Sequence, residues 1–252
     1  MIDLHCHIIP MVDDGARNAS VACEMAAHAY RNGIDTIVAT PHCNLRGARS
    51  NYRGRLYTEF FSLFRALLRQ REIPVRLLPG AELFAHPSNL RRLLDERRVV
   101  TLNHSRYLLT EFNFQTRGED ISDALDLIAK RGLVPVVAHP ERYVAVQHDL
   151  RFVGRWFAKG YVIQINKGSL LGRLGYSSQI TGEAILTAGL AHVIATDAHD
   201  MKYRPTGFRT LLPYLHEHCP QEYITLLLEK NPNRIISDEP IPVPKHENII
   251  RR

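Results

Sequence analysis

The sequence predicts an α/β fold in which parallel strands alternate with helices and close into a distorted barrel. Apolar, β-rich segments alternate with helical patterns about seven times along the 252 residues, which is typical of a parallel sheet. These segments are nearly continuous in apolar residues, as expected for strands covered on both faces. Nearly every one ends in His, Asp or Glu. A closed ring of strands brings such ends together at the face where (β/α) barrels carry their active sites, so we prefer a barrel to an open sheet.

The first half of the chain contains four strand–helix units. Apolar residues recur at a helical period, for example at Val21, Met25 and Ala29, and Gly33 is a typical helix stop. The expected strands are the opening segment up to His7 and residues 36–39, 75–78 and 107–110, and the expected helices are 21–30, 56–68, 90–94 and 121–130.

The second half contains three further units and a closing helix. The expected strands are 134–138, 162–165 and 192–195, and the expected helices are 150–158, 182–188, 208–216 and 221–228. No linker or low-complexity segment interrupts the pattern, so residues 1–236 are predicted to form a single barrel domain. Residues 237–252 are polar and rich in proline, and we expect an irregular tail there.

The composition is that of an ordinary globular protein, with 45% hydrophobic and 23% charged residues. No window approaches the roughly 18 apolar residues of a membrane span. The N-terminus lacks the basic and apolar regions of a signal peptide. The four cysteines follow no framework spacing, and we interpret them as free thiols. We therefore expect a cytoplasmic protein without a transmembrane segment. The net charge of +6 suits an anionic substrate or partner.

The first strand ends in a pair of histidines, His5 and His7. Side chains two apart on a strand point the same way, so the two imidazoles project together and Cys6 faces the opposite side. Such a pair is a natural first half of a metal site. A buried histidine pair held by backbone hydrogen bonds is the alternative for one isolated His-x-His.

Metal-capable side chains also follow the later strands. Each one alone has a structural explanation, as a turn residue, a charge at a helix start or a capped core histidine. Their shared placement favours ligands of several ions, because each ion takes roughly four to six groups including water. A mixture of imidazole and carboxylate suits Mn, Fe or Zn. The residues are His42, Glu82, Glu111, His139, Asp197 and His199.

These motifs together resemble a known superfamily. The segments are Asp3-Leu4-His5-Cys6-His7, Asp13-Asp14-Gly15, Thr40-Pro41-His42, Gly80-Ala81-Glu82, Tyr107-Leu108-Leu109-Thr110-Glu111, His139-Pro140-Glu141-Arg142 and Thr196-Asp197-Ala198-His199. In order and spacing they resemble the polymerase-and-histidinol-phosphatase (PHP) superfamily. Within it, the chain is similar to the bacterial manganese-dependent protein-tyrosine phosphatases of the CpsB/YwqE type. The similarity runs from residue 1 to about residue 236.

The resemblance implies a distorted (β/α)7 barrel with three divalent ions, of which Mn is the expected metal and Fe, Zn or Mg are alternatives. By position, one ion is assigned to His5, His7, Glu82 and Asp197; one to Glu82, Glu111 and His139; and one to Asp14, His42 and His199. Arg142 and Arg204 match the phosphate-binding arginines of the family. With Asp197 they are the predicted catalytic residues.

The implied activity is hydrolysis of phosphotyrosine by a metal-bridging hydroxide. The implied partner is a phosphotyrosine protein, a membrane-associated bacterial tyrosine autokinase of capsule or exopolysaccharide synthesis. No stable nucleic-acid binding is expected, because no basic-aromatic motif accompanies the positive charge. The arginine-rich segment from Cys43 to Arg55 and the tail after Ser237 depart from the pattern of the family.

Three alternatives stay open at this point. His42-Cys43 is followed by Arg49 at the spacing of cysteine-dependent tyrosine phosphatases, although Leu45 and Arg46 are bulky for a phosphate-cradling loop. A second alternative is another PHP phosphoesterase, either a histidinol-phosphate phosphatase or a nuclease. The third is a non-catalytic PHP module that regulates a partner.

Overall fold

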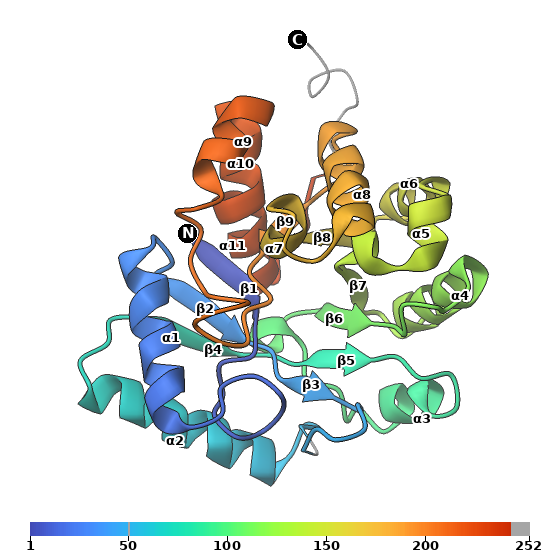
Figure 1. The fold of residues 1–252 in the computed structure, drawn as a ribbon. Helices are drawn as coiled ribbons and strands as arrows, with labels where there is room; N and C mark the ends of the chain where they lie inside the picture. Colours follow the sequence, from blue (N-terminus) through green and yellow to red (C-terminus); the bar gives the residue numbers. More distant parts are fainter. Residues whose placement is uncertain (50, 243–252) are drawn as a thin grey trace.

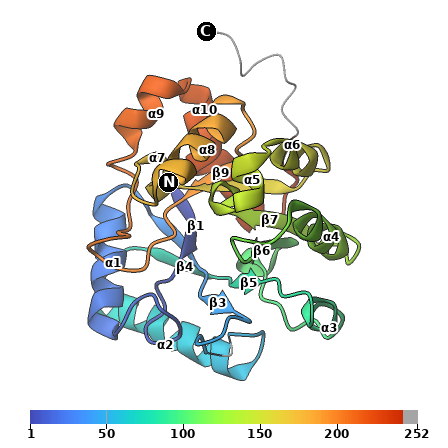
Figure 2. The ribbon, with the colours of Figure 1, turned by 45° about the vertical axis from the view of Figure 1, so that its right-hand side comes forward.

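The computed structural model describes residues 1–49 and 51–242, in which strands lie at the centre and helices surround them (Figure 1; Figure 2). The strands are β1 (Ile2–Cys6), β2 (Thr36–Ala39), β3 (His42–Cys43), β4 (Arg76–Pro79), β5 (Glu82–Phe84), β6 (Tyr107–Glu111), β7 (Val134–Ala138), β8 (Val162–Asn166) and β9 (Val193–Ala195). Every ladder between them is parallel. The predicted parallel α/β fold is therefore confirmed.

Helices follow the strands along the chain. The α-helices are α1 (Ala19–Arg31), α2 (Arg55–Gln70), α3 (Leu90–Asp95), α4 (Gly118–Ala129), α5 (Val144–His148), α6 (Arg151–Ala158), α7 (Lys167–Leu170), α8 (Tyr176–Thr187), α9 (Leu212–His218), α10 (Gln221–Thr225) and α11 (Asn231–Ile236). Short helices η1 (Leu102–His104) and η2 (Pro140–Arg142) and a π-helix η3 (Leu226–Lys230) complete the set. In α2, Tyr57, Phe61, Phe64 and Leu68 are buried at a helical period, which is why this segment forms an amphipathic helix against the strands.

Two of the expected strands are interrupted. The strand at 36–39 resumes after Thr40 and Pro41 as β3, and the strand at 75–78 resumes after Gly80 and Ala81 as β5. Pro41 has no N–H to donate to a ladder, and the Gly80 N–H donates to the Tyr57 hydroxyl instead of a neighbouring strand. The ladders of the described residues form two sheets, β1-β2-β4 and β3-β5-β6-β7-β8-β9. A closed ring of seven strand–helix units stays a prediction.

Several helix boundaries differ from the predicted ones. Helix α8 begins at Tyr176, before the predicted 182–188, because its first turns bury Ser178 and Thr181 rather than apolar residues. Helix α9 begins at Leu212 instead of 208, with a proline in its first turn, where the missing N–H has no helical partner to lose. The short helices α5, α7 and α11 were not expected, because segments of four to six residues carry too little periodicity.

Apolar side chains of the strands form two separate clusters. One cluster combines one face of the strands with the helices around them, for example Ile37 with Phe64. The other contains the opposite strand face, and among the described residues its helical members come from η1 and α11 alone. Its members are Ile2, Leu4, Val38, Leu78, Leu102, Tyr107, Leu109, Val136, Ala138, Val162, Val193, Ile235 and Ile236. We call this second cluster the apolar layer. Residues of η1 and α11 close it at one end.

After α11, residues 237–242 contain no helix or strand. They pack at the start of β6, where Asp238 accepts from Arg106 and the Tyr107 hydroxyl donates to the Glu239 carbonyl at 2.6 Å. The rest of the predicted tail, 243–252, lies outside the described residues. No helix of the described residues is long and apolar enough to span a membrane.

Candidate metal centre

The predicted ligands converge at the C-terminal ends of the strands, directly beyond the apolar layer. Alternation along the strands places most of them there: Leu109 is followed two residues later by Glu111, and Val38 four residues later by His42. On β1 the alternation is broken, because Leu4 already belongs to the inner face. A register shift between Asp3 and Cys6 inserts one extra residue against β2, so that His5 and His7 also face inward. Cys6 points to the outer cluster, as predicted.

The first group of four predicted ligands is tightly assembled. His5 Nε2 lies 3.1 Å from His7 Nε2 and 3.2 Å from Glu82 Oε1. Asp197 Oδ1 lies 3.4 Å from each of the two ring nitrogens. Two ligand atoms about 2.1 Å from one ion at an octahedral angle are separated by about 3 Å. These spacings therefore fit an ion placed between the four side chains.

The other predicted ligands extend this group on both sides. His139 Nε2 lies 3.1 Å from Glu82 Oε1 and 3.7 Å from Glu111 Oε1. On the other side, Asp14 Oδ1 lies 3.5 Å from His42 Nε2 and 3.4 Å from His199 Nε2. Glu82 touches both His5 and His139, as the assignment of a bridging carboxylate requires.

Sets of ligand atoms within 4.8 Å of one another show how these residues group: His7, Asp14, His42 and His199; His5, His139 and Asp197; His5, His7 and Glu82; and His42, Glu82 and Glu111. All nine predicted ligands occur in these sets. The sets overlap, and they place His42 with Glu82 and Glu111 as well as with Asp14. How the ligands are divided among ions stays a prediction.

Unsatisfied polar atoms indicate that the cluster is built for a ligand. Among the described residues, five buried side-chain atoms lack a hydrogen-bond partner, and four belong to predicted ligands: His42 Nδ1, Glu82 Oε2, His139 Nδ1 and His199 Nε2. Buried polar groups without partners are rare in folded proteins and need an explanation such as an ion. Imidazole nitrogens and carboxylate oxygens are suitable donors for divalent transition metals.

The pKa shifts in the cluster also indicate that it is built for a cationic ligand. Burial raises the pKa of Glu111 to about 9, and the neighbouring carboxylates Glu82 and Asp197 add to the shift. Burial also lowers the pKa of His139 to about 4, which keeps its imidazole neutral and able to bind a metal. Three carboxylates so close together cannot all ionise without compensating cations.

Several residues that orient the ligands were not predicted from the sequence. Asp13 Oδ2 accepts from His7 Nδ1 at 2.8 Å and from the His42 N–H at 2.9 Å. Gln164 Oε1 lies 2.8 Å from His5 Nδ1. Such partners fix the tautomer and orientation of a metal-binding histidine. The position of Asp13 beside Asp14 was the only available sequence signal, since Gln164 is 159 residues away from His5.

A second chain of buried groups supports Asp197. Asn166 donates from Nδ2 to Asp197 Oδ2 at 2.6 Å, and its backbone N–H donates to Glu141 Oε1. Burial raises the pKa of Glu141 to about 7. Ser169 also donates to Glu141 Oε1, at 2.7 Å. The end of β8 thus holds Asp197 in place across 31 residues of sequence.

The two predicted arginines lie beside Asp197. Arg204 forms an ion pair with Asp197 Oδ2, and Arg142 Nη1 lies 3.6 Å from the same oxygen. The Arg142 guanidinium also lies 4.3 Å above the ring of Phe114. Lys167 holds the loop after Arg204 by donating to the Pro205 carbonyl and, at 2.9 Å, to the Gly207 carbonyl. Both arginines are therefore held at the edge of the ligand cluster.

A cavity of about 280 Å³, which we call the site cavity, opens over the ligands. Both arginines line it, together with six of the nine candidate ligands: Asp14, His42, Glu82, Glu111, His139 and Asp197. Phe84, Phe112 and Phe114 form an aromatic wall that was not predicted from the sequence. The site cavity therefore combines anion-binding groups with a surface suited to an aromatic ring.

The geometry contradicts cysteine-based catalysis. Cys43 is buried in the outer apolar cluster, and burial raises the pKa of its thiol to about 12. Its arginine partner in that hypothesis, Arg49, donates to the Met11 carbonyl and lies over Phe60. A cysteine nucleophile needs an accessible thiolate, so this loop does not form a phosphate cradle.

Curated relatives match nearly the whole chain. A tyrosine-protein phosphatase YwqE of Bacillus subtilis is 33% identical over 229 residues, which cover 91% of this chain and 89% of the relative. A tyrosine-protein phosphatase CpsB of Streptococcus pneumoniae is 29% identical over 244 residues, which cover 95% of this chain and 99% of the relative.

Solved structures also match nearly the whole chain. The crystal structures described as YwqE from Bacillus subtilis and CpsB from Streptococcus pneumoniae, unique metal-dependent tyrosine phosphatases, provide a match with a TM-score of 0.87 and 30% identity over 100% of both chains. A phosphotriesterase homology protein from Escherichia coli matches with a TM-score of 0.62 at 12% identity, covering 93% of this chain and 98% of its own, which shows a shared fold alone. The family model of capsular polysaccharide synthesis, CpsB/CapC, matches residues 1–237. The chain therefore belongs to the CpsB/CapC family of capsular polysaccharide synthesis.

Proposed function

We propose that this protein is a metal-dependent phosphatase of phosphotyrosine proteins. The observation that carries the proposal is the convergence of nine imidazole and carboxylate ligands, six of which line one cavity together with two arginines. The names of the relatives in Bacillus and Streptococcus agree with this activity.

The ligand groups described above would hold up to three divalent ions, of which Mn is our first choice. Such ions, when bound, lower the pKa of water and neutralise phosphate oxygens. Glu82 would bridge two of them, because it lies within 3.2 Å of both His5 and His139. Asp13 and Gln164 would keep the histidines in the tautomer that presents Nε2 to the metal.

The arginines and the aromatic wall would receive the substrate. A guanidinium grips a phosphate through two parallel hydrogen bonds, and Arg142 and Arg204 stand where the phosphate of a substrate would meet the ligands. Phe112 and Phe114 would contact the tyrosine ring. Phenolate is a good leaving group, with a pKa of about 10 for its conjugate acid, so the reaction needs little help from a general acid.

We also infer that the strands form one distorted ring of seven positions. Backbone hydrogen bonds support closure between the first strand and the last: the Asp197 N–H donates to the His5 carbonyl at 2.8 Å, and the His7 N–H donates to the Ala198 carbonyl at 2.9 Å. The Glu82 N–H donates to the Pro41 carbonyl at 3.1 Å, which bridges the interruptions of the other two strands.

We place the protein in the cytoplasm, acting on a membrane-associated tyrosine kinase of capsule synthesis. All four cysteines are free, including the partly exposed Cys23 and Cys219, which suits a reducing compartment. The family assignment to capsular polysaccharide synthesis supports such a substrate.

A substrate panel tests the activity. The metal-stripped protein is assayed on a phosphotyrosine peptide, a phosphoserine peptide, histidinol phosphate and single-stranded DNA, with Mn, Fe, Zn or Mg added back. We expect metal-dependent hydrolysis of the phosphotyrosine peptide above all. Preferred cleavage of histidinol phosphate or DNA would assign the protein to another PHP activity. Full activity in a strong chelator, with no transition metal found by elemental analysis, would refute the metal mechanism.

A further inference from the structure

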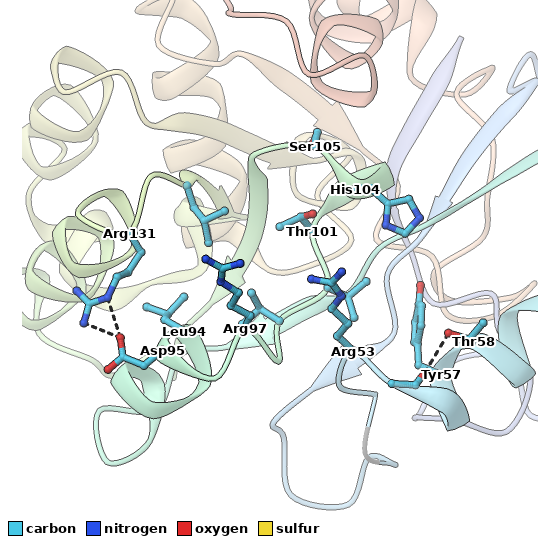
Figure 3. Close-up of a pocket in the computed structure, with 14 residues that line it drawn as sticks. Arg53, Tyr57, Thr58, Leu94, Asp95, Arg97, Thr101, His104, Ser105 and Arg131 are labelled. Atoms are coloured by element: carbon cyan, nitrogen blue, oxygen red, sulfur yellow. Dashed lines mark hydrogen bonds and ion pairs between the residues drawn. The ribbon is translucent and has the colours of Figure 1, made fainter.

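A second and larger cavity, of about 600 Å³, lies on the flank of the molecule. We call it the flank pocket. It lies between the start of α2, the end of α3 and the segment before β6, and it shares no lining residue with the site cavity. Figure 3 shows Arg53 and Arg97 directed toward the segment that carries Thr101 and His104. Leu94, Val99 and Val100 form an apolar floor.

The flank pocket has an excess of positive charge. Its only carboxylate is Asp95, and the Arg131 guanidinium already pairs with it at 2.7 Å (Figure 3). Within residues 1–49 and 51–242, the side chains of Arg53 and Arg97 have no hydrogen-bonding or acidic partner. Both are exposed. The flank pocket therefore offers two free guanidinium groups above an apolar surface.

The flank pocket is linked to the site cavity by the arginine-rich segment that departs from the family pattern. Leu45 lines the site cavity, and Arg53 of the same segment lines the flank pocket. The segment is anchored to the metal centre, because the buried Asn51 donates to the carbonyl of His42 at 2.8 Å. The Arg53 N–H donates to the Arg98 carbonyl at 2.7 Å, which fixes this end of the segment against the chain after α3.

We propose that the flank pocket binds an acidic segment of the phosphoprotein substrate while its phosphotyrosine occupies the site cavity. This inference rests on the proposed phosphatase function. Charge complementarity carries it: carboxylates of the segment would pair with Arg53 and Arg97, and an apolar side chain would rest on Leu94 and Val99. The contact would strengthen substrate binding without touching the reacting phosphate, so it would act on KM and leave kcat unchanged.

The test compares two phosphotyrosine peptides of equal length, one flanked by Glu and Asp and the other by Gln and Asn. In the Arg53→Ala/Arg97→Ala variant we expect KM for the acidic peptide to rise about five-fold or more, in line with the loss of two partly exposed charge contacts. The KM for the neutral peptide and turnover of free phosphotyrosine should stay the same. The control variant Arg69→Ala/Arg209→Ala removes the same charge from exposed positions outside both cavities and should leave all three substrates unaffected.

Equilibrium binding separates this inference from the phosphatase function. The acidic peptide without phosphate, carrying a fluorescent label, should bind the wild-type protein in an anisotropy titration and weaken with added salt. Binding that is equal in the wild type and the Arg53→Ala/Arg97→Ala variant would overturn the docking proposal, whatever the enzymatic result. A change of oligomeric state in that variant, without loss of peptide binding, would assign the flank pocket to another copy of the chain. Absence of hydrolysis with binding intact would overturn only the phosphatase function.

Discussion

The inner face of the strands is divided into two layers of opposite chemistry. Near the N-terminal ends of the strands, the apolar layer contains residues such as Leu4 and Val136, and Ile235 closes it from below. Near the C-terminal ends, the same strands carry the nine candidate ligands, which we call the polar layer. Burial is similar in both except at the exposed Asp14: His5, Glu82 and Leu4 are all 0% exposed.

The two layers differ in how their groups are satisfied. The apolar layer is stabilised by removal of hydrocarbon from water, and this stabilisation requires no bound ligand. The polar layer keeps four buried atoms without hydrogen-bond partners and places carboxylates beside one another. The first layer is thus built for stability and the second for binding, which is the usual division between a scaffold and its site.

The largest expected effect comes from removing the centre of the polar layer. Asp197→Ala should lower kcat/KM by roughly 10³-fold or more, because the side chain lies against His5, His7 and both arginines. Metal content should fall as well. Activity assays and elemental analysis check this, and full kcat/KM with full metal content in the variant would contradict the place of Asp197 in the metal centre.

A matched change in the apolar layer should have the opposite profile. Ile235→Ala in α11 removes a side chain that is 0% exposed and distant in sequence from every ligand. We expect the free energy of unfolding to fall by about 2–4 kcal/mol, from lost burial and the cavity left behind. The kcat of the folded fraction and its metal content should remain near the wild-type values. A loss of activity larger than the loss of folded protein would show that the layers are coupled.

Arg142 tests the rim of the polar layer. Arg142→Ala should lower kcat/KM on a phosphotyrosine peptide by roughly 10²-fold, similar to the loss of one preorganised donor. Arg142→Lys should recover only part of this, because an ammonium cannot form the two parallel bonds of a guanidinium. Metal content and melting temperature should be unchanged. If the Ala variant keeps full turnover, the arginine is only a surface partner of Asp197.

His192 provides a contrast to the histidines of the candidate metal centre. It is 6% exposed, its Nδ1 accepts from the Ile163 N–H at 3.0 Å, and its ring stacks on Phe157. Burial lowers its pKa to about 4. Below pH 6.5 the unfolded chain binds a proton at this histidine that the folded chain does not, so its contribution to stability is lost as pH falls from 6.5 toward 4.

We expect this loss to be about 2 kcal/mol between pH 7 and pH 5, because the pKa of this histidine is about 4 in the folded chain and about 6.5 in the unfolded chain. Urea unfolding of the metal-free wild type and of His192→Gln is measured at both pH values. The loss of unfolding free energy between pH 7 and pH 5 is then compared between the two proteins. The variant should lose less stability on acidification. Equal losses in the two proteins would mean that His192 takes up its proton in the folded state.

The smallest effect on activity is expected at Cys43. Its thiol is buried, with a pKa raised to about 12, and it takes no part in the site cavity. Cys43→Ser should keep most of the phosphatase activity and normal metal content. Loss of activity with intact metal would restore the cysteine-based alternative.

Much of the fold could be predicted, because buried strands and helical periodicity can be recognised from the local sequence. The strands around Leu109 and Val136 were located correctly. Glu111 reaches the site by alternation, because it lies two residues after the inward-facing Leu109. The start of α8 could not be predicted, because it buries Ser178 and Thr181 against neighbours that the local sequence does not reveal. The interruption at Gly80 depends likewise on the distant Tyr57 hydroxyl.

The candidate site likewise has features that the sequence predicts and features that only the tertiary structure shows. The sequence by itself determined the ligand types and their place after each strand, since these follow from residue identity and strand parity. Only the tertiary structure decided how they are aimed. The extra residue in β1 turns His5 inward after Leu4, and the left-handed backbone of His139, with φ of 34°, turns its ring toward Glu82.

The orienting partners were also decided only by the tertiary structure. Gln164 reaches His5, and Asn166 reaches Asp197, from a strand that has no metal-capable residue of its own. The aromatic wall and the flank pocket are assembled from segments far apart along the chain. Local sequence encodes which face of an element is buried. Contacts between such distant residues depend on the three-dimensional packing of the whole chain, and no local pattern records them.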